Sequence, residues 1–176
     1  MSTGNITETH QYLTFSLADE EYAVDVIQVN SVLDSSKITK LPNTPDYMRG
    51  VINLRGAVVP IIDLRMKFGM SKTEETVDTS IIVLEINYHG ETVTAGAMAD
   101  SVQEVIELSP ENIEDVPKIG LKLKHEFVKG MGKRDDSFII ILDIDKIFSA
   151  EDMTELFQET KKEEAQKTAK NNSPEE

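Results

Sequence analysis

The chain has 176 residues, of which 39% are hydrophobic and 28% are charged, a balance typical of a folded globular protein. Its net charge of −14 argues against binding to nucleic acid or to anionic lipid, since both require a clustered basic surface. There is no cysteine, which excludes disulfides and thiolate chemistry. The N-terminal residues lack the features of a signal peptide, and no apolar run has the roughly 20 residues of a membrane span, so we expect a cytoplasmic protein.

Short β-strands dominate the elements predicted in the first half of the chain. Residues 1–10 are polar and are expected to be disordered. Apolar and polar residues alternate over 11–17, which predicts a strand with one buried face. Further strands are predicted at 22–24, 29–33, 51–54 and 57–62, with a helical turn at 25–28. Pro60 has no amide hydrogen to donate, so its strand is expected to lie at a sheet edge or to contain a bulge.

A polar, acidic stretch at 70–79 is interpreted as a linker between two units. Beyond it, hairpins are predicted from 81–86 with 92–98 and from 127–133 with 137–142, and a β-rich stretch lies at 102–108. Strands at such short intervals predict small β-barrels.

The C-terminal region follows a helical pattern instead. Met153, Leu156 and Phe157 have i, i+3, i+4 spacing, which predicts a helix over about 150–160 that packs against the barrels. Residues 161–176 lack large apolar side chains and are expected to be disordered.

The second half of the chain repeats the first. Residues 50–69 and 130–149 each begin with Gly, continue with an apolar run and an Asp, and carry a Phe one position before the end, at an offset of 80. Upstream, residues 29–32 resemble residues 102–105 at an offset of 73. Two small units side by side share a seam, and such a seam is a natural binding site. The repeat predicts three equivalent pairs of side chains: Ile62 with Leu142, Leu64 with Ile144, and Phe68 with Phe148.

Patterns of catalytic and cofactor sites are weak or missing. The three histidines, at 10, 89 and 125, are far apart and have no thiol companions, which argues against zinc. Asp143-Ile144-Asp145 resembles the opening of a calcium loop, but the later positions of that loop do not fit. No phosphate-binding loop and no nucleophile elbow occurs. We therefore predict no cofactor, no metal and no catalytic residue.

Asn53-Leu54-Arg55-Gly56 stands at a predicted hairpin tip. One interpretation is a tight turn whose Arg points into water, since Asn and Gly tolerate left-handed backbone. The other is that the tip presents a guanidinium able to bind a carboxylate with two hydrogen bonds. Spacing alone leaves both open.

Three neighbouring segments form a long motif: Asn-Thr-Pro at 43–45, Arg-Gly-Val-Ile-Asn-Leu-Arg-Gly at 49–56, and Val-Pro-Ile-Ile-Asp-Leu-Arg at 59–65. This motif resembles the CheW coupling proteins of bacterial chemotaxis, and the similarity runs from about Tyr12 to Leu156. The family often has Glu at the position aligned with Ser31, where it can pair with the motif's Arg. That partner is missing here, so the role of Arg55 is less closely tied to the family pattern.

The resemblance implies a mainly β fold: two SH3-like, five-stranded β-barrels packed together, at about 11–70 and 80–149, with a C-terminal helix. It also implies a non-enzymatic adaptor that couples the cytoplasmic tips of transmembrane chemoreceptors to the histidine kinase CheA in signalling arrays. We expect a chain that is monomeric in isolation and does not insert into the membrane. The alternatives are an adaptor of another chemosensory array and, from a different class, a double β-barrel that binds a small ligand or is an enzyme.

We place the two partners on separate faces. An apolar groove between the barrels, with the hairpin tip at its rim, is predicted to receive a helical receptor tip. Its residues are Val26, Val29, Val32, Asn53, Leu54, Arg55, Gly56 and Val102. A face of the first barrel is predicted to bind the kinase through Thr44, Tyr47, Met48, Arg49 and Gly50.

Overall fold

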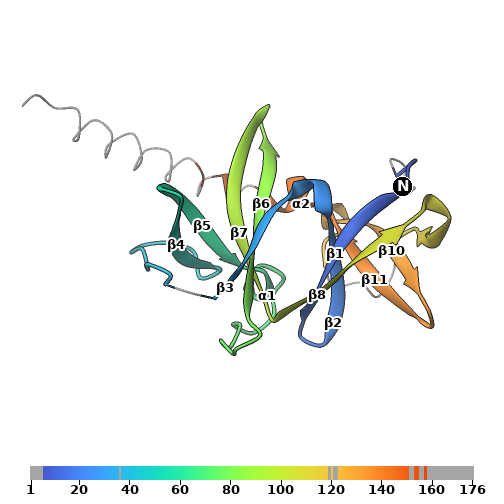
Figure 1. The fold of residues 1–176 in the computed structure, drawn as a ribbon, viewed down its shortest axis with the longest axis horizontal. Helices are drawn as coiled ribbons and strands as arrows, with labels where there is room; N and C mark the ends of the chain where they lie inside the picture. The colour runs from blue at the N-terminus through green and yellow to red at the C-terminus, as the bar shows by residue number, and fades with distance from the viewer. Residues whose placement is uncertain are drawn as a thin grey trace, which may run out of the picture.

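The computed structural model describes residues 6–35, 37–118, 120, 123–150, 153, 154 and 157. Its described part consists of two curled β-sheets that stand side by side, with two short helices between them (Figure 1). The first sheet has the strand order β3 (Val29–Asp34), β6 (Ser80–Tyr88), β7 (Glu91–Ala99), β5 (Ala57–Asp63), β4 (Met48–Leu54). The second has the order β8 (Ser101–Leu108), β1 (His10–Leu17), β2 (Glu20–Asp25), β11 (Ser137–Leu142), β10 (Val128–Arg134), β9 (Ile113–Glu114).

Helical segments are few and short. They are α1 (Leu64–Lys67), α2 (Ile144–Phe148), and the 3-10 turns η1 (Val26–Gln28), η2 (Pro110–Asn112) and η3 (His125–Phe127). Beyond α2, Met153, Thr154 and Phe157 are helical, and the side chains of Met153 and Phe157 are buried, as the C-terminal pattern predicts. Leu156 lies outside the described residues, as do residues 1–5 and 158–176, where most of the expected disorder falls.

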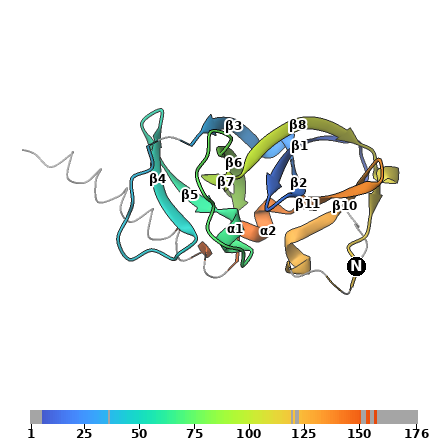
Figure 2. The same cartoon turned by 90° about the horizontal axis from the view of Figure 1, so that it is seen from below.

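Each sheet forms a small barrel, so the predicted fold class is confirmed; the first barrel has five strands and the second has six. The composition of each barrel differs from the expected division at residues 70–80. The β1–β2 hairpin belongs to the second barrel and the β6–β7 hairpin to the first (Figure 2). The two sequence units have thus exchanged their first hairpins, and each hairpin joins its new barrel through a parallel pair of strands, β2 with β11 and β7 with β5. The exchange ties the two barrels together.

The internal repeat is present in the strand register. β4 and β10 each have a register shift opposite β5 and β11, between Met48 and Gly50 in one and between Val128 and Gly130 in the other. Both hairpin tips carry a non-glycine residue with positive φ, Arg55 at 53° and its counterpart at 135 at 52°. The backbone amides of Asp63 and Asp143 donate to the carbonyls of Tyr47 and Phe127, at 2.7 and 2.8 Å. The offset of 80 therefore relates equivalent backbone positions.

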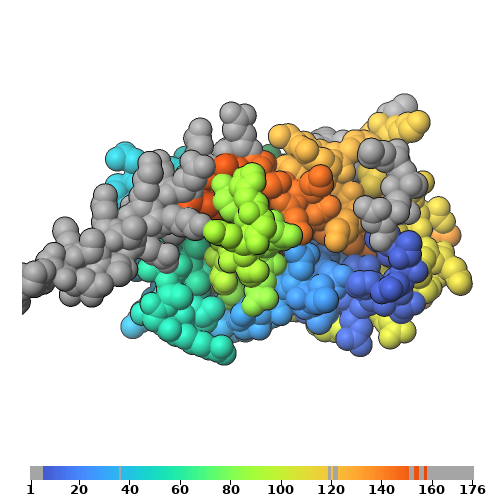
Figure 3. Space-filling view, turned by 90° about the horizontal axis from the view of Figure 1, so that it is seen from above, coloured from blue at the N-terminus to red at the C-terminus, as the bar shows by residue number. Residues whose placement is uncertain are grey.

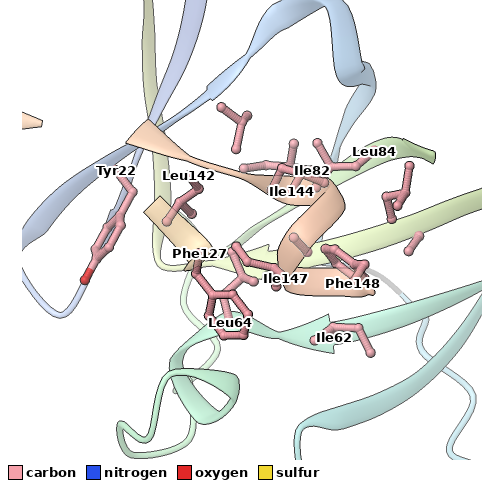
Figure 4. Packing of buried hydrophobic residues seen from close by; sticks show 14 of the residues in the cluster. Tyr22, Ile62, Leu64, Ile82, Leu84, Phe127, Leu142, Ile144, Ile147 and Phe148 are labelled. Atoms are coloured by element: carbon pink, nitrogen blue, oxygen red, sulfur yellow. The ribbon is translucent and has the colours of Figure 1, made fainter. Parts of the chain in front are cut away.

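A single large core fills the space between the two sheets. Figure 4 shows the side chains of both helices, among them Leu64, Ile147 and Phe148, meeting residues of both sheets. Smaller clusters of buried residues occupy the interior of each barrel. The central strand β6 contributes Ile82 and Leu84 to the core between the sheets and Ile81 to the barrel interior. Burial on both faces explains why β6 reads as an unbroken aliphatic run.

Two local predictions differ from the structure. Pro60 lies in a strand with neighbours on both sides, and the register shift falls in β4, between Met48 and Gly50. Proline is accommodated because the parallel pairing of β5 with β7 begins one residue later, at Ile61. The polar stretch at 70–79 is held to the first barrel by Thr73, which is buried.

Candidate functional site

The predicted groove between the barrels is closed by the core. Val26, Val29 and Val102 are partly buried and pack on the side chains that fill the space between the sheets. The η1 turn brings Val26 there, because the Asp25 side chain accepts a hydrogen bond from the Ile27 amide at 3.0 Å and caps the turn. These three valines lie at the edge of a packed interface, and they do not line an open groove.

Two exposed apolar side chains occupy equivalent edge strands near this position. Val32 on β3 is 44% exposed and Val105 on β8 is 52% exposed. They are related by the offset of 73, and the pairing of Val32 with Ile82 corresponds to that of Val105 with Leu13. Figure 2 shows β3 and β8 along the same side of the molecule. Sequence reasoning missed Val105 as a site residue, although the repeat itself could have identified it.

We call this surface the β3–β8 strip. It combines partly buried and exposed apolar residues of η1, β3 and β8: Val26, Ile27, Val29, Val32, Val102 and Val105.

The hairpin tip belongs to a different surface. Arg55 and Gly56 have φ values of 53° and 86°, which fits the two central positions of a type I′ turn. The Asn53 side chain accepts a hydrogen bond from the Gly56 amide at 2.8 Å, so Asn53 stabilises the turn. Arg55 is exposed and forms no hydrogen bond or ion pair with any residue that the structure describes.

A groove of about 380 Å³ adjoins this tip. In Figure 3 the tip of the β6–β7 hairpin (lime) stands beside the β4–β5 hairpin (teal), and residues of both contribute to the groove. Its lining is mainly apolar: Asn30, Leu54, Arg55, Ala57, Val58, Val59, Pro60, Tyr88, Thr92, Val93, Thr94 and Phe157. Of the predicted receptor-binding residues, only Leu54 and Arg55 lie here. The structure therefore divides that set between two surfaces.

The equivalent tip of the second barrel is internally paired. Arg134 forms ion pairs with Glu21, at 3.4 Å, and with Glu104. Glu104 corresponds to Ser31 through the offset of 73, so the carboxylate that is missing beside β3 is present beside β8. In the first barrel Ser31 donates to the neighbouring Asn30 side chain at 3.2 Å.

Three of the predicted kinase-binding residues have structural roles instead. Met48 and Gly50 are buried. Gly50 has φ of 137°, and a Cβ atom there would stand 2.2 Å from the Thr39 carbonyl oxygen, so the position requires glycine. The Arg49 guanidinium, 14% exposed, donates to Asp63 at 3.2 Å and to the carbonyl of Thr73 at 3.3 Å. These residues can influence a partner only through the shape of the barrel.

The remaining two predicted kinase-binding residues are partly accessible. The Thr44 hydroxyl donates to the Leu41 carbonyl oxygen at 3.4 Å. Tyr47 lies beneath the ammonium of Lys67, which is 4.9 Å from the ring centroid. The flanking residues Pro42, Asn43, Pro45 and Asp46 are exposed. Contact with a partner on this face is therefore restricted to the turn that precedes β4.

Asp63 organises the first barrel around Arg49. This fully buried carboxylate caps α1 by accepting from the amides of Arg65 and Met66. It also accepts from the amide and the hydroxyl of Thr73, at 3.0 and 2.8 Å. A buried carboxylate needs such donors to offset the loss of hydration. The network explains why the stretch at 70–79 follows the barrel surface.

Within the described ranges, no group of three or more His, Cys, Asp and Glu side chains could hold a metal ion. The same part of the chain contains no helix long and apolar enough to cross a membrane.

Comparison with known proteins gives one consistent family. The family model described as CheW-like domain matches residues 11–152. The chemotaxis protein CheW of Klebsiella aerogenes is 37% identical over 147 residues, covering 84% of this chain and 86% of that protein. The chemotaxis protein CheW of Helicobacter pylori is 34% identical over 80% of this chain and 82% of its own length.

A solved structure gives the same result for the fold. The scaffolding protein TtCheW from Thermoanaerobacter tengcongensis matches with a TM-score of 0.71 and 38% identity, over 81% of this chain and 94% of that one. With the motif at 43–65, the doubled barrel and these relatives in agreement, the chain belongs to the CheW-like domain family.

Proposed function

We propose that this chain is a chemotaxis scaffold that couples chemoreceptors to the histidine kinase CheA. The observation that carries the proposal is the family match over residues 11–152, together with relatives named as chemotaxis proteins and a structural neighbour named as a scaffolding protein. A scaffold works by binding two partners at once, so its site residues belong to surfaces, and we assign no catalytic step to any of them. Because the receptor tips that such a scaffold meets lie in the cytoplasm, we assign the chain to that compartment.

The receptor face is the β3–β8 strip. An amphipathic helix binds a surface that offers apolar side chains at intervals, and the strip offers Val32 and Val105 on two edge strands of different barrels. The partly buried Val29 and Val102 lie behind them and are packed on the core. Residues anchored in this way keep their conformation when a partner binds, which reduces the entropic cost of association.

The kinase face is the turn before β4. Thr44 and Tyr47 are its accessible members, and the exposed loop residues from Pro42 to Asp46 flank them. Met48, Arg49 and Gly50 support this turn from within the barrel. This division predicts that substitutions at Thr44 or Tyr47 weaken kinase binding without unfolding the chain, whereas substitutions at Gly50 do both.

Arg55 at the rim of the groove is assigned to a partner carboxylate. Among the described residues it has no internal acid, and a guanidinium can form two charge-assisted hydrogen bonds with one carboxylate. The groove beside it accommodates an apolar side chain next to that acid. This assignment extends the receptor face from the strip to the tip of the first barrel.

Binding to separate partner fragments tests the assignment. The full chain is mixed with an isolated CheA regulatory domain and, in a second experiment, with receptor-tip peptides, and each affinity is measured by calorimetry. Val32→Glu combined with Val105→Glu places two charges on the strip and is expected to abolish receptor binding while kinase affinity is unchanged.

Phe138→Glu is the matched control, because Phe138 is also 52% exposed but lies on β11, away from the strip. Receptor affinity that survives the double substitution, or is lost equally in the control, would remove the strip from the receptor face. Absence of binding to both fragments would remove the proposed coupling function.

A further inference from the structure

A second pocket of the first barrel lies between the segment that follows β3 and the stretch at 70–79. It has a volume of about 390 Å³ and is lined by Ser35, Lys37, Ile38, Lys40, Arg49 and Glu75. None of these except Arg49 belongs to the surfaces described above, and Arg49 appears there only as a structural residue. The lining is mostly polar, in contrast to the groove beside Arg55.

The charges of this pocket run against those of the whole molecule. Three cations, Lys37, Lys40 and Arg49, face one carboxylate, that of Glu75, in a chain with a net charge of −14. Lys37 and Lys40 are exposed and form no ion pair with any described residue. A local excess of positive charge in an acidic protein attracts anionic groups at short range.

The single carboxylate in the pocket is weakly held. Glu75 is 52% exposed, and its nearest contact with Arg49 joins Oε1 to Nη2 at 3.4 Å. Asp63, by contrast, is fully buried and bonded to the other terminal nitrogen of the same guanidinium. An incoming acid can therefore replace Glu75 at Nη2 without breaking the buried pair. Glu75 also shows which chemistry fits, since the group that already contacts this nitrogen is a carboxylate.

A buried hydroxyl adds an independent donor. The Ser35 Oγ atom is inaccessible to solvent and has no hydrogen-bond partner among the described residues. An unsatisfied buried hydroxyl costs free energy, and an acceptor atom in the pocket would relieve that cost.

The second barrel has acidic residues at the equivalent place. The bridge of Thr39 with Val51 corresponds to the pairing of Glu114 with Met131. The residue after the bridge is Lys40 in the first barrel and Asp115 in the second. The cationic pocket is therefore a property of the first barrel's side chains and not of the shared backbone.

We propose that this pocket binds the carboxylate of an acidic side chain of a protein partner, in exchange for Glu75. Lys37 and Lys40 attract the acid, and Arg49 Nη2 and the Ser35 hydroxyl donate to it. The pocket lies beside the turn that precedes β4. In naming the kinase as the source of the acid, the inference rests on the proposed function; the carboxylate site itself does not.

The test titrates the ¹⁵N-labelled full chain with N-acetyl-tetraglutamate amide at constant ionic strength, following the backbone amides of Lys37, Thr39 and Gly50. We expect saturable shifts, a dissociation constant raised about fivefold or more by Lys37→Gln or Lys40→Gln, and one lowered by Glu75→Gln. Lys146→Gln removes the same charge from α2, and it should change nothing. Sodium phosphate, in a parallel titration, should bind more weakly than the peptide.

Three results would overturn the inference: no saturable shift with the peptide, equal weakening by Lys40→Gln and Lys146→Gln, or tighter binding of phosphate than of peptide. An unchanged affinity in Glu75→Gln would overturn the exchange. Peptide binding is measured without the kinase, so a failure of the coupling function leaves this result readable. Kinase affinity that is unaffected by Lys37→Gln and Lys40→Gln would overturn the kinase as the source of the acid.

Discussion

In the second barrel, the arginine at the hairpin tip is held by two carboxylates, whereas in the first barrel the tip arginine has no partner among the described residues. The backbones of the two tips are equivalent, down to the positive φ of Arg55 and Asp135. The pocket after the edge strand shows the same contrast, with lysines in one barrel and acids in the other. The repeated backbone therefore supplies two copies of each surface, and side chains decide which copy is open to a partner.

The acids that cap the two helices should differ most in stability. Asp63 is buried with Arg49 and accepts five hydrogen bonds, while Asp143 is partly exposed and caps α2 through the amide of Lys146. Asp63→Ala is expected to reduce the free energy of unfolding by about 3–5 kcal/mol, because it leaves a buried cation without its partner. Asp143→Ala should cost about 1 kcal/mol, as the loss of a cap does. Urea unfolding midpoints measure both, and equal losses would contradict the assigned roles.

The residues that follow the helices give the next contrast. Phe157 is buried against Tyr88 and Phe148, with ring centroids 5.4 and 6.1 Å away, whereas Val77, at the equivalent offset of 80, is 98% exposed. Phe157→Ala should lower the free energy of unfolding by about 3 kcal/mol, and Val77→Ala should change it by less than about 0.5 kcal/mol. Thermal unfolding of the two variants measures the difference. A fully stable Phe157→Ala protein would show that the C-terminal helix does not pack on the first barrel in solution.

A third contrast depends on pH. Tyr22 lies in the core between the sheets, where the offset of 73 places Ala95 in the other half. Burial, with the charge of Glu20 and a hydrogen bond to it, raises the pKa of Tyr22 to about 12. Because the folded pKa is above the unfolded value near 10, this stabilisation is complete below pH 10 and is lost as pH rises towards 12. Tyr22→Phe should retain more of its stability in that range, as unfolding midpoints at pH 9 and pH 12 would measure. An identical alkaline loss in both proteins would exclude Tyr22 as its source.

The smallest effects concern the two tip arginines. Arg134→Ala should reduce stability by about 0.5–1 kcal/mol, since its ion pairs are about one-third exposed and partly screened. Arg55→Ala should change stability by less than about 0.5 kcal/mol but weaken a partner complex by about 1–3 kcal/mol. Arg55→Lys should restore only part of that affinity, because an ammonium does not form the paired hydrogen bonds of a guanidinium. Lost stability with unchanged affinity in Arg55→Ala would identify an internal brace instead.

Much of the architecture was predictable from local pattern. The hairpins, the helical turn at 25–28 and the burial of Met153 and Phe157 follow from alternation, turn residues and helical spacing, all of which act over a few residues. The hairpin exchange was not predictable in this way. Pairing of β2 with β11 joins residues more than 100 positions apart, and nothing in either strand's own sequence specifies its neighbour.

The site residues divide along the same line. The sequence by itself determined the family, the repeat and the tip with Arg55, because each is carried by residue identity and spacing. Only the tertiary structure decided that the seam is filled, that Arg49 serves Asp63, and that Val105 joins Val32 on the exposed strip. Accessibility and pairing depend on which side chains from distant segments reach the same place. Packing between the two sheets sets that outcome, and local sequence cannot.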